Sequence, residues 1–405
     1  MSKKVLLHVG TPKTGTSYLQ DVLFHNQRVL EESGILYPGR RFDAHFLGAL
    51  DLMRLPWGGL EHEAVGAWDD LAHAVRAHDG TSIISHEILA TASRSQAGRA
   101  LASLGDPATT EVHLVLSARD LIRQIPAEWQ ENVKHRAALS YEQFLERLQD
   151  PAREGRIPSW FWGVQEVPDI LDRWGGGLPP ERVHVVTVPP PGGAPEVLWK
   201  RFSAIFGLDD VELDLHTERA NPSLGVPETT LVRRINIAAN KDVPPVHYRP
   251  LVRELLAHRT LSHRTGSPRL SLPPDLLPWV TELQDAWIDE LKVRGYDVVG
   301  DLDELRGIAP DPEKWTDPDR PREKQVAEAA VDAIKALLLE AARQREEIDG
   351  LHRELAESRA ALDRAHLMPV YRLRKKIVRV LESSGGGQLL LRVYRRVRGR
   401  SSRSA

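Results

Sequence analysis

The stretch that decides the fold is Lys4–Val9 (KVLLHV) together with the loop that follows it, Gly10–Ser17 (GTPKTGTS). The first part is a short apolar run rich in Val and Leu, as expected for a parallel strand that is covered on both faces. An amphipathic pattern over Ser17–Ser33 predicts that a helix begins where the loop ends. A strand, a tight glycine loop and a helix start form a cradle for an anion, because backbone N–H groups and the helix dipole converge there.

Individual residues of this loop suit an anionic ligand. Lys13 adds a full positive charge, Gly15 allows a phosphate to approach the backbone closely, and Thr16 and Ser17 offer hydroxyl groups at the helix entrance. Gly10 and Gly15 have the spacing of the Walker A loop, but Thr16 stands where that loop has its lysine. We therefore expect a phosphate-like ligand, whereas a triphosphate held with magnesium is disfavoured.

Strand-like and helix-like segments alternate from the loop up to about residue 308. This alternation predicts an α/β fold in which a P-loop-like parallel sheet is flanked by helices. The predicted strands are Lys4–Val9, Thr81–Ser85, Val112–Ser117 and Arg182–Val188. The predicted helices after Ser17–Ser33 are Leu121–Ala137, Tyr141–Leu148, Val167–Trp174, Pro195–Phe206 and Leu276–Arg294.

The chain beyond this predicted domain, 1–308, has a different composition. Residues 309–322 contain four prolines and many charges, which predicts a linker. A helix is expected over 323–365. Within it, mostly apolar residues over 327–362 recur with alternating spacings of three and four, which favours a coiled coil and a homodimer. A single solvated helix is the alternative, because the repeating positions include alanines, a Gln and a Ser.

Charge is distributed unevenly along the chain. Its 405 residues carry a net charge of −3, but residues 366–405 hold eleven Lys and Arg against one acid, so residues 1–365 carry −13. The basic tail contains two amphipathic stretches, Tyr371–Leu381 and Leu389–Arg398. These stretches favour contact with an anionic membrane surface, although an acidic partner or a solvated tail fits the same composition. A nucleic-acid partner is not expected.

The composition also limits the chemistry and the location. The chain has no cysteine, which excludes disulfides, thiolate zinc sites and cysteine nucleophiles. No apolar run approaches the roughly 18–20 residues of a membrane-spanning helix. We therefore expect a cytoplasmic protein whose tail can lie at the inner face of the membrane.

The segment Pro12–Leu19 (PKTGTSYL) resembles the PKxGTTWL phosphosulfate loop of sulfotransferases that use 3′-phosphoadenylyl sulfate. A second block supports the resemblance, because the predicted strand Val112–Ser117 leads to Arg119, as in the second motif of that family. The resemblance implies that Tyr18 lies next to the adenine and that Arg119 contacts the 3′-phosphate. The loop residues assigned to this cofactor are Lys13, Thr14, Gly15, Thr16 and Ser17. The family places a serine eight residues after Arg119, where this chain has Ala127.

Sulfuryl transfer between two oxygens needs a cation at the leaving oxygen, hydrogen-bond donors around the group and a base for the acceptor hydroxyl. Lys13 supplies the cation, and no metal ion is expected. Either His86 or Glu87 is a candidate base, because both directly follow a predicted strand and the carboxyl ends of parallel strands open on one crevice. His45 is a further candidate, since glycan-modifying members of the family place a glutamate base in this region. Purely structural roles for Glu87, at a helix start, and for His45, inside a helix, are the alternatives.

Together these features predict a sulfotransferase that moves a sulfuryl group from 3′-phosphoadenylyl sulfate to a hydroxyl of a glycan, glycolipid or secondary metabolite. One alternative is a P-loop kinase-like phosphotransferase, which the position of Lys13 disfavours. The other is an inactive interaction protein that retains the sulfotransferase fold, which the alanine at position 127 favours.

Overall fold

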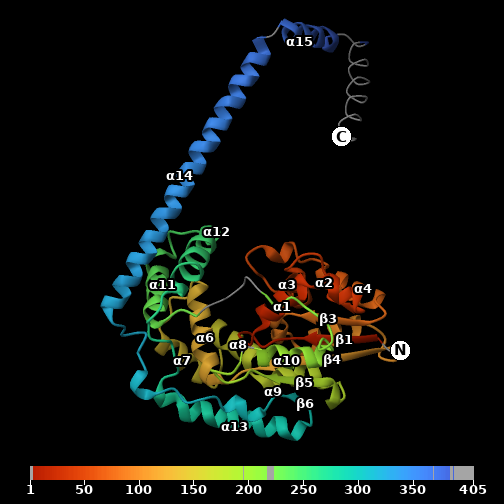
Figure 1. Cartoon of the computed structure of the whole chain (residues 1–405), viewed down its shortest axis with the longest axis vertical. Coiled ribbons are helices and arrows are strands. Elements are labelled where there is room, and N and C mark those ends of the chain that lie inside the picture. The colour runs from red at the N-terminus through yellow and green to blue at the C-terminus, as the bar shows by residue number, and fades with distance from the viewer. Residues whose placement is uncertain (1–2, 195, 217–222, 368, 384–385, 387–405) are drawn as a thin grey trace. The chain divides into compact units, whose positions relative to one another are not determined.

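A computed structural model describes residues 3–194, 196–216, 223–367, 369–383 and 386 (Figure 1). The chain forms two compact units, 1–333 and 334–405. The first unit contains one sheet of six parallel strands in the order β2-β3-β1-β4-β5-β6, so the predicted α/β class is confirmed. The strands are β1 (Lys3–His8), β2 (Ile35–Leu36), β3 (Thr81–Ser85), β4 (Thr110–Ala118), β5 (Val183–Thr187) and β6 (Asp297–Val299).

Helices flank this sheet. The helices of the chain are α1 (Thr16–His25), α2 (Gln27–Glu32), α3 (Ala44–Met53), α4 (Ala67–Ala77), α5 (Arg94–Ser103), α6 (Leu121–Lys134), α7 (Tyr141–Gln149), α8 (Arg156–Gln165), α9 (Val167–Gly175), α10 (Glu196–Phe206), α11 (Val226–Ala239), α12 (Pro245–Tyr248), α13 (Leu277–Arg294), α14 (Glu323–Leu367) and α15 (Pro369–Glu382). In the second unit, the described residues belong to the helices α14 and α15, apart from residues 383 and 386. Shorter or irregular helices are η1 (Leu60–His62), η2 (Glu87–Thr91), η3 (Pro180–Arg182), the π-helix η4 (Arg249–His258), η5 (Leu261–His263), η6 (Pro274–Leu276), η7 (Leu302–Arg306) and η8 (Pro312–Lys314).

Successive residues of a strand point to opposite faces of the sheet. Leu6 and Val115 pack in a core cluster with Leu19 of α1 and Phe202 of α10. The neighbouring Leu114 points the other way, towards α9, where a Cβ on Gly175 would lie 3.4 Å from it. Strands that are buried on both faces explain why their sequences are continuous apolar runs.

The helix predicted over Ser17–Ser33 is divided into α1 and α2 at Asn26. The Asn26 side-chain amide donates to Val22 O at 2.8 Å and to Asp214 O at 2.9 Å, and its carbonyl accepts from Asp214 N at 2.9 Å. An Asn side chain that bonds to backbone groups competes with the helix ladder. The break therefore attaches the end of α1 to a segment far away in the sequence.

The segment 309–322, predicted as a linker, lies against the first unit. Thr230 Oγ1 donates to Pro318 O at 2.9 Å, and Glu142 N donates to Asp319 Oδ2 at 2.9 Å. The first turns of α14 then bury Val326, Ala329 and Ala333. The first unit therefore continues past residue 308 and includes the first turns of α14, up to Ala333.

No helix in the described part of the chain is both long enough and apolar enough to cross a membrane. Of the two basic stretches predicted in the tail, the first falls within α15, whereas Leu389–Arg398 lies outside the described residues.

Candidate active site

The candidate site lies at the carboxyl ends of β1, β3 and β4, which are neighbours in the sheet. The loop 10–17 connects β1 to α1, as predicted. Two backbone hydrogen bonds attach this loop to β4. Thr11 N donates to Ser117 O at 2.8 Å, and Ser117 N donates to Gly10 O at 2.6 Å. The loop is therefore fixed to the end of the neighbouring strand.

The two glycines of the loop are required by its path. Gly10 has a φ of +125°, and a Cβ there would lie 2.9 Å from the backbone oxygen of Glu87. Gly15 has a φ of +89°, and a Cβ there would lie 2.6 Å from Leu198 Cδ2 in α10. Such positive φ angles are disfavoured for residues with side chains. The loop thus passes directly between Glu87 and α10.

The Thr14 side chain supports the loop from within. Its hydroxyl donates to Thr11 O at 2.5 Å and lies 2.6 Å from Ser117 Oγ, which in turn donates to Gly10 O at 2.9 Å. Because Thr14 Oγ1 is already bound to protein, a ligand would meet the backbone of this residue rather than its hydroxyl. At the start of α1, Thr16 is buried and Ser17 is exposed.

His8, which the sequence analysis did not single out, connects the three strand ends. Its Nδ1 lies 2.8 Å from Ser85 Oγ and its Nε2 lies 3.2 Å from Ser117 Oγ, while its ring packs edge-on against Phe202. Burial lowers the pKa of His8 to about 4, so the ring is neutral at neutral pH. A histidine at the end of an otherwise apolar strand was the signal in the sequence that could have identified it.

Lys13 forms an ion pair with Glu131 of α6. The distance from Lys13 Nζ to Glu131 Oε2 is 2.5 Å, and Lys13 has a positive φ of 65°. Burial alone would raise the pKa of Glu131, but the hydrogen bond from His135 and the charges of Lys13 and Lys134 hold it well below its usual range. Glu131 lies one helical turn after Ala127, so the partner of the loop lysine is an acid from α6.

Arg119 directly follows β4, two residues after Ser117, and has unused hydrogen-bonding capacity. Its Nη2 donates to Arg123 O at 3.2 Å, whereas its buried Nε has no partner among the described residues. Burial lowers the pKa of Arg119 to about 10. A buried donor without a partner is costly, and an anionic oxygen would satisfy it. Arg119 is therefore an under-bonded guanidinium that follows the strand to which the loop is attached.

Glu87 and His86 lie beside the loop, at the end of β3. Gln20 Nε2 of α1 donates to Glu87 Oε2 at 2.9 Å, and His86 Nδ1 lies 4.0 Å from the same oxygen. Burial opposes ionisation of Glu87, but His86 and the hydrogen bond from Gln20 hold its pKa below the usual value. Burial also lowers the pKa of His86, whose Nδ1 accepts from Ile88 N at 3.3 Å. Glu87 is thus an ionised carboxylate next to the cradle.

His45 uses both ring nitrogens to bind the backbone. Its Nδ1 accepts from Ser85 N at 3.1 Å, so the Nε2 proton is donated to Pro38 O at 2.6 Å. The ring packs on Tyr37, with centroids 4.2 Å apart, and burial lowers its pKa to about 4. These contacts favour a role for His45 in fixing the end of β3 and disfavour proton transfer by it.

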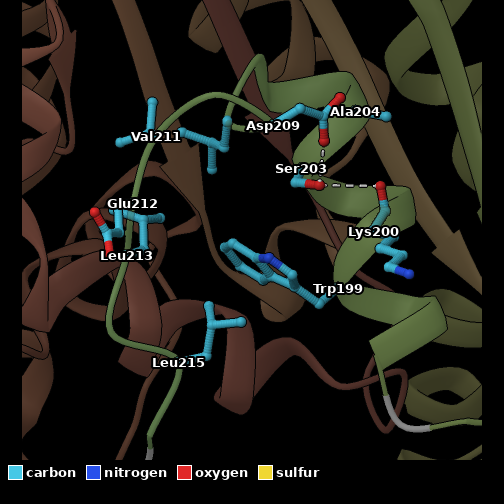
Figure 2. Close-up of a pocket in the computed structure, with 10 residues that line it drawn as sticks. Trp199, Lys200, Ser203, Ala204, Asp209, Val211, Glu212, Leu213 and Leu215 are labelled. Carbon is cyan, nitrogen blue, oxygen red and sulfur yellow. Dashed lines mark hydrogen bonds between the residues drawn. The ribbon is translucent and has the colours of Figure 1, made fainter.

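An open pocket with a volume of about 640 Å³ lies between α10 and residues 208–215 (Figure 2). Trp199 reaches into it, and the opposite wall is formed by Val211, Leu213 and Leu215. The pocket adjoins the loop, because the rings of Trp199 and Tyr18 meet edge to face with centroids 6.3 Å apart. Tyr18 therefore lies between the start of α1 and the pocket.

Among the described residues, no group of three or more His, Asp or Glu side chains is arranged to hold a metal ion. Comparison of the chain with protein-family models, with curated proteins and with solved structures gave no match. The functional assignment therefore rests on the residues and geometry of the site.

Proposed function

We propose that the chain is a sulfotransferase that uses 3′-phosphoadenylyl sulfate and transfers the sulfuryl group to a hydroxyl of a glycan, glycolipid or secondary metabolite. The observation that carries this proposal is that two cationic residues, Lys13 and Arg119, follow the neighbouring strands β1 and β4. Lys13 precedes Gly15 in the strand–loop–helix connection, and the buried Nε of Arg119 lacks a partner at the end of the next strand. A donor with two separate anionic groups would engage both.

The residues around the loop fit the parts of such a donor. The loop backbone and the Ser17 hydroxyl would hold its phosphosulfate, since the N-terminus of α1 attracts anions. Arg119 would bind the 3′-phosphate through a bidentate or charge-assisted contact. Tyr18 and Trp199 would lie against the nucleobase, because their rings already form one aromatic corner beside the loop.

The proposed chemistry divides between Lys13 and Glu87. When bound, 3′-phosphoadenylyl sulfate supplies the activated sulfuryl group. Lys13 would neutralise negative charge that develops on the leaving oxygen, for which it must exchange or share its contact with Glu131. The ionised Glu87 would accept the proton of the attacking hydroxyl. His86 would position Glu87, or replace it as the base if its ring tautomer changes.

Two alternatives are each favoured by one feature. The glycine spacing of the loop suits a P-loop phosphotransferase, but Thr16 occupies the position of the Walker lysine. The Lys13–Glu131 ion pair, together with the missing serine at position 127, suits a protein that binds a nucleotide without turnover.

Incubation of the protein with radiolabelled 3′-phosphoadenylyl sulfate and a cell extract, without added metal, tests the proposal. We expect label to move to a hydroxyl-bearing compound and expect Glu87→Gln to slow this transfer by about 10²–10⁴. Transfer of phosphate from ATP with magnesium would support the phosphotransferase. Tight nucleotide binding with no transfer from any extract would support the inactive protein.

We also propose that two copies of this chain pair through α14 in the second unit. The apolar residues of α14 that follow its buried first turns are exposed, with Ile348, Leu351 and Leu355 at 48%, 57% and 47%. Their spacing of three and four matches a coiled-coil seam, so a second copy of this chain is the proposed partner. Sedimentation of the full chain should give a dimer that Leu351→Glu dissociates. A wild-type monomer at micromolar concentration would contradict this pairing.

A further inference from the structure

Four rings form a row that begins beside the proposed base Glu87. His86 Nδ1 lies 4.0 Å from Glu87 Oε2, and the His86 ring packs against Phe46 of α3 with centroids 5.2 Å apart. Trp57 packs edge-on against Phe46 at 5.6 Å, and Trp160 of α8 lies 6.0 Å from Trp57. This aromatic row, His86, Phe46, Trp57 and Trp160, thus brings together side chains from segments that are far apart in the sequence.

The backbone around the aromatic row is held in place. The short helix η2 contacts α3, where Thr91 Oγ1 donates to Met53 Sδ at 3.2 Å. It also approaches α8, where a Cβ on Gly163 would lie 4.0 Å from Thr91 Cγ2. The loop that carries Trp57 is fixed by Glu61, whose Oε2 accepts from Trp57 N at 2.8 Å. The rings of the row are therefore mounted on connected elements.

The tryptophans of the row differ from those of the core. Trp129, Trp162 and Trp174 are buried, and each of their indole N–H groups donates to a backbone carbonyl. Trp57 and Trp160 are partly exposed, and neither indole N–H has a hydrogen-bond partner in the part of the chain that the structure describes. The row therefore offers apolar ring surface and two unused donors to a ligand from solvent.

A carbohydrate fits these features better than a flat aromatic molecule does. A sugar ring has a face of C–H groups that packs on an aromatic ring, and its hydroxyl oxygens accept from an indole N–H. The rings of the row are inclined, by 81° between Phe46 and Trp57 and by 48° between Trp57 and Trp160. Neighbouring rings therefore cannot stack on both sides of one flat molecule, but each can face a different sugar unit.

We propose that the aromatic row is an acceptor subsite that binds an oligosaccharide and directs one of its hydroxyls to Glu87. This inference rests on the proposed function and narrows its acceptor to a glycan. The sugar unit nearest His86 would be modified, and the following units would pack on Trp57 and Trp160. The hydroxyl oxygen would take the sulfuryl group, its proton would pass to Glu87, and 3′-phosphoadenosine 5′-phosphate would leave.

An array of immobilised neutral and acidic oligosaccharides tests this subsite, with the full chain labelled and saturated with 3′-phosphoadenosine 5′-phosphate. We expect the wild type to bind oligosaccharides, and Trp57→Ala or Trp160→Ala to weaken binding about tenfold, since one stacking contact is lost. Trp57→Phe should retain most of the binding, because it keeps an aromatic ring.

Trp279→Ala is the matched control. Trp279 is also partly exposed, but it packs edge-on against the buried Trp162 at 6.4 Å and is not part of the row. This variant should bind oligosaccharides like the wild type. Calorimetry should show the same nucleotide affinity in the wild type and in all four variants.

The outcomes separate this inference from the proposed function. Nucleotide binding without binding to any oligosaccharide would overturn the glycan subsite and leave the sulfotransferase intact. The same holds if Trp57→Ala, Trp160→Ala and Trp279→Ala bind alike, or if naphthol, a flat aromatic probe, displaces the oligosaccharide. Failure of the wild type to bind the nucleotide would overturn the proposed function, and the acceptor role of the row with it.

Discussion

Lys13 is the residue through which the loop would act on the reaction. Lys13→Ala should lower turnover by about 10²–10³, the usual loss when one preorganised donor to developing charge is removed. Folding should be unaffected, because the loop path depends on Gly10, Gly15 and the Thr14 hydroxyl. Steady-state rates and thermal unfolding measure the two effects, with exposed Lys241→Ala as the control. Turnover within about threefold of wild type would remove Lys13 from the mechanism.

The candidate bases can be separated by their contacts. Glu87→Gln should lose about 10²–10⁴ in turnover but keep nucleotide binding, as expected for loss of a general base. His86→Gln should lose less, because it acts mainly through Glu87. His45→Gln should reduce stability more than turnover, since both ring nitrogens bind the backbone. Rates at saturating nucleotide together with urea unfolding distinguish these effects. A larger loss of turnover at His45 than at Glu87 would mean that the base is misassigned.

Two buried histidines predict a loss of stability in mild acid. The pKa values of His8 and His45 in the folded protein are about 4, below the unfolded value of about 6.5. As the pH falls, these histidines therefore bind protons in the unfolded chain before they do so in the folded protein. The free energy of unfolding is thus highest above about pH 6.5 and decreases towards pH 4. Each histidine should contribute roughly 2 kcal/mol to the difference in the free energy of unfolding between pH 7 and pH 5.

Urea unfolding of His45→Gln at these two pH values tests the contribution of that histidine. The free energy of unfolding should fall less between pH 7 and pH 5 in the variant than in the wild type, even if the variant is less stable at both pH values. Replacement of the exposed His247 by Gln should leave the drop unchanged. Identical pH dependence of His45→Gln and the wild type would contradict the burial argument.

At the scale of elements, periodicity predicted the four central strands and several helices, but it missed the two edge strands and other helices, among them α4 and α11. All four predicted strands are present with ends within two residues, and α6, α7, α9 and α13 lie where amphipathic patterns placed them. The edge strands β2 and β6 have two and three residues, too few for a periodic signal. The break at Asn26 depends on Asp214, a contact that no local pattern contains.

The same limit applies to the candidate site. The loop was predictable because its strand, glycines and helix are contiguous in the sequence. The pairing of Lys13 with Glu131 joins residues 118 positions apart, so it required the fold. The same is true of Arg253, which reaches Glu131 from η4. The contacts of the Ser117 hydroxyl with His8, Thr14 and Gly10 could not be predicted, because a serine in a strand can have many different partners.

At the scale of the whole molecule, the basic tail predicts binding to a membrane surface. In α15, Leu373, Ile377 and Val380 recur with spacings of four and three and are 60%, 50% and 67% exposed. The helix sequence also contains five Lys and Arg, each worth about 1 kcal/mol near an anionic bilayer. A basic helix with an exposed apolar stripe is thus suited to an anionic lipid surface.

Flotation with liposomes that contain anionic lipid tests this role. The full chain should float, a 1–365 truncation should not, and Ile377→Asp should reduce binding by placing a charge in the apolar stripe. Liposomes of neutral lipid are the control for charge. Equal binding of the full chain and the truncation, or no binding by either, would contradict a membrane role without affecting the catalytic assignment.

The central claim is that the loop and Arg119 bind a nucleotide with a 3′-phosphate. Calorimetry with 3′-phosphoadenosine 5′-phosphate, without metal, tests it most directly when compared with ATP and magnesium. We predict that the first ligand binds more tightly and that Arg119→Ala removes most of this preference, because the variant lacks the guanidinium whose buried Nε would bind the 3′-phosphate. Tighter binding of ATP with magnesium, or an unchanged preference in Arg119→Ala, would contradict the account.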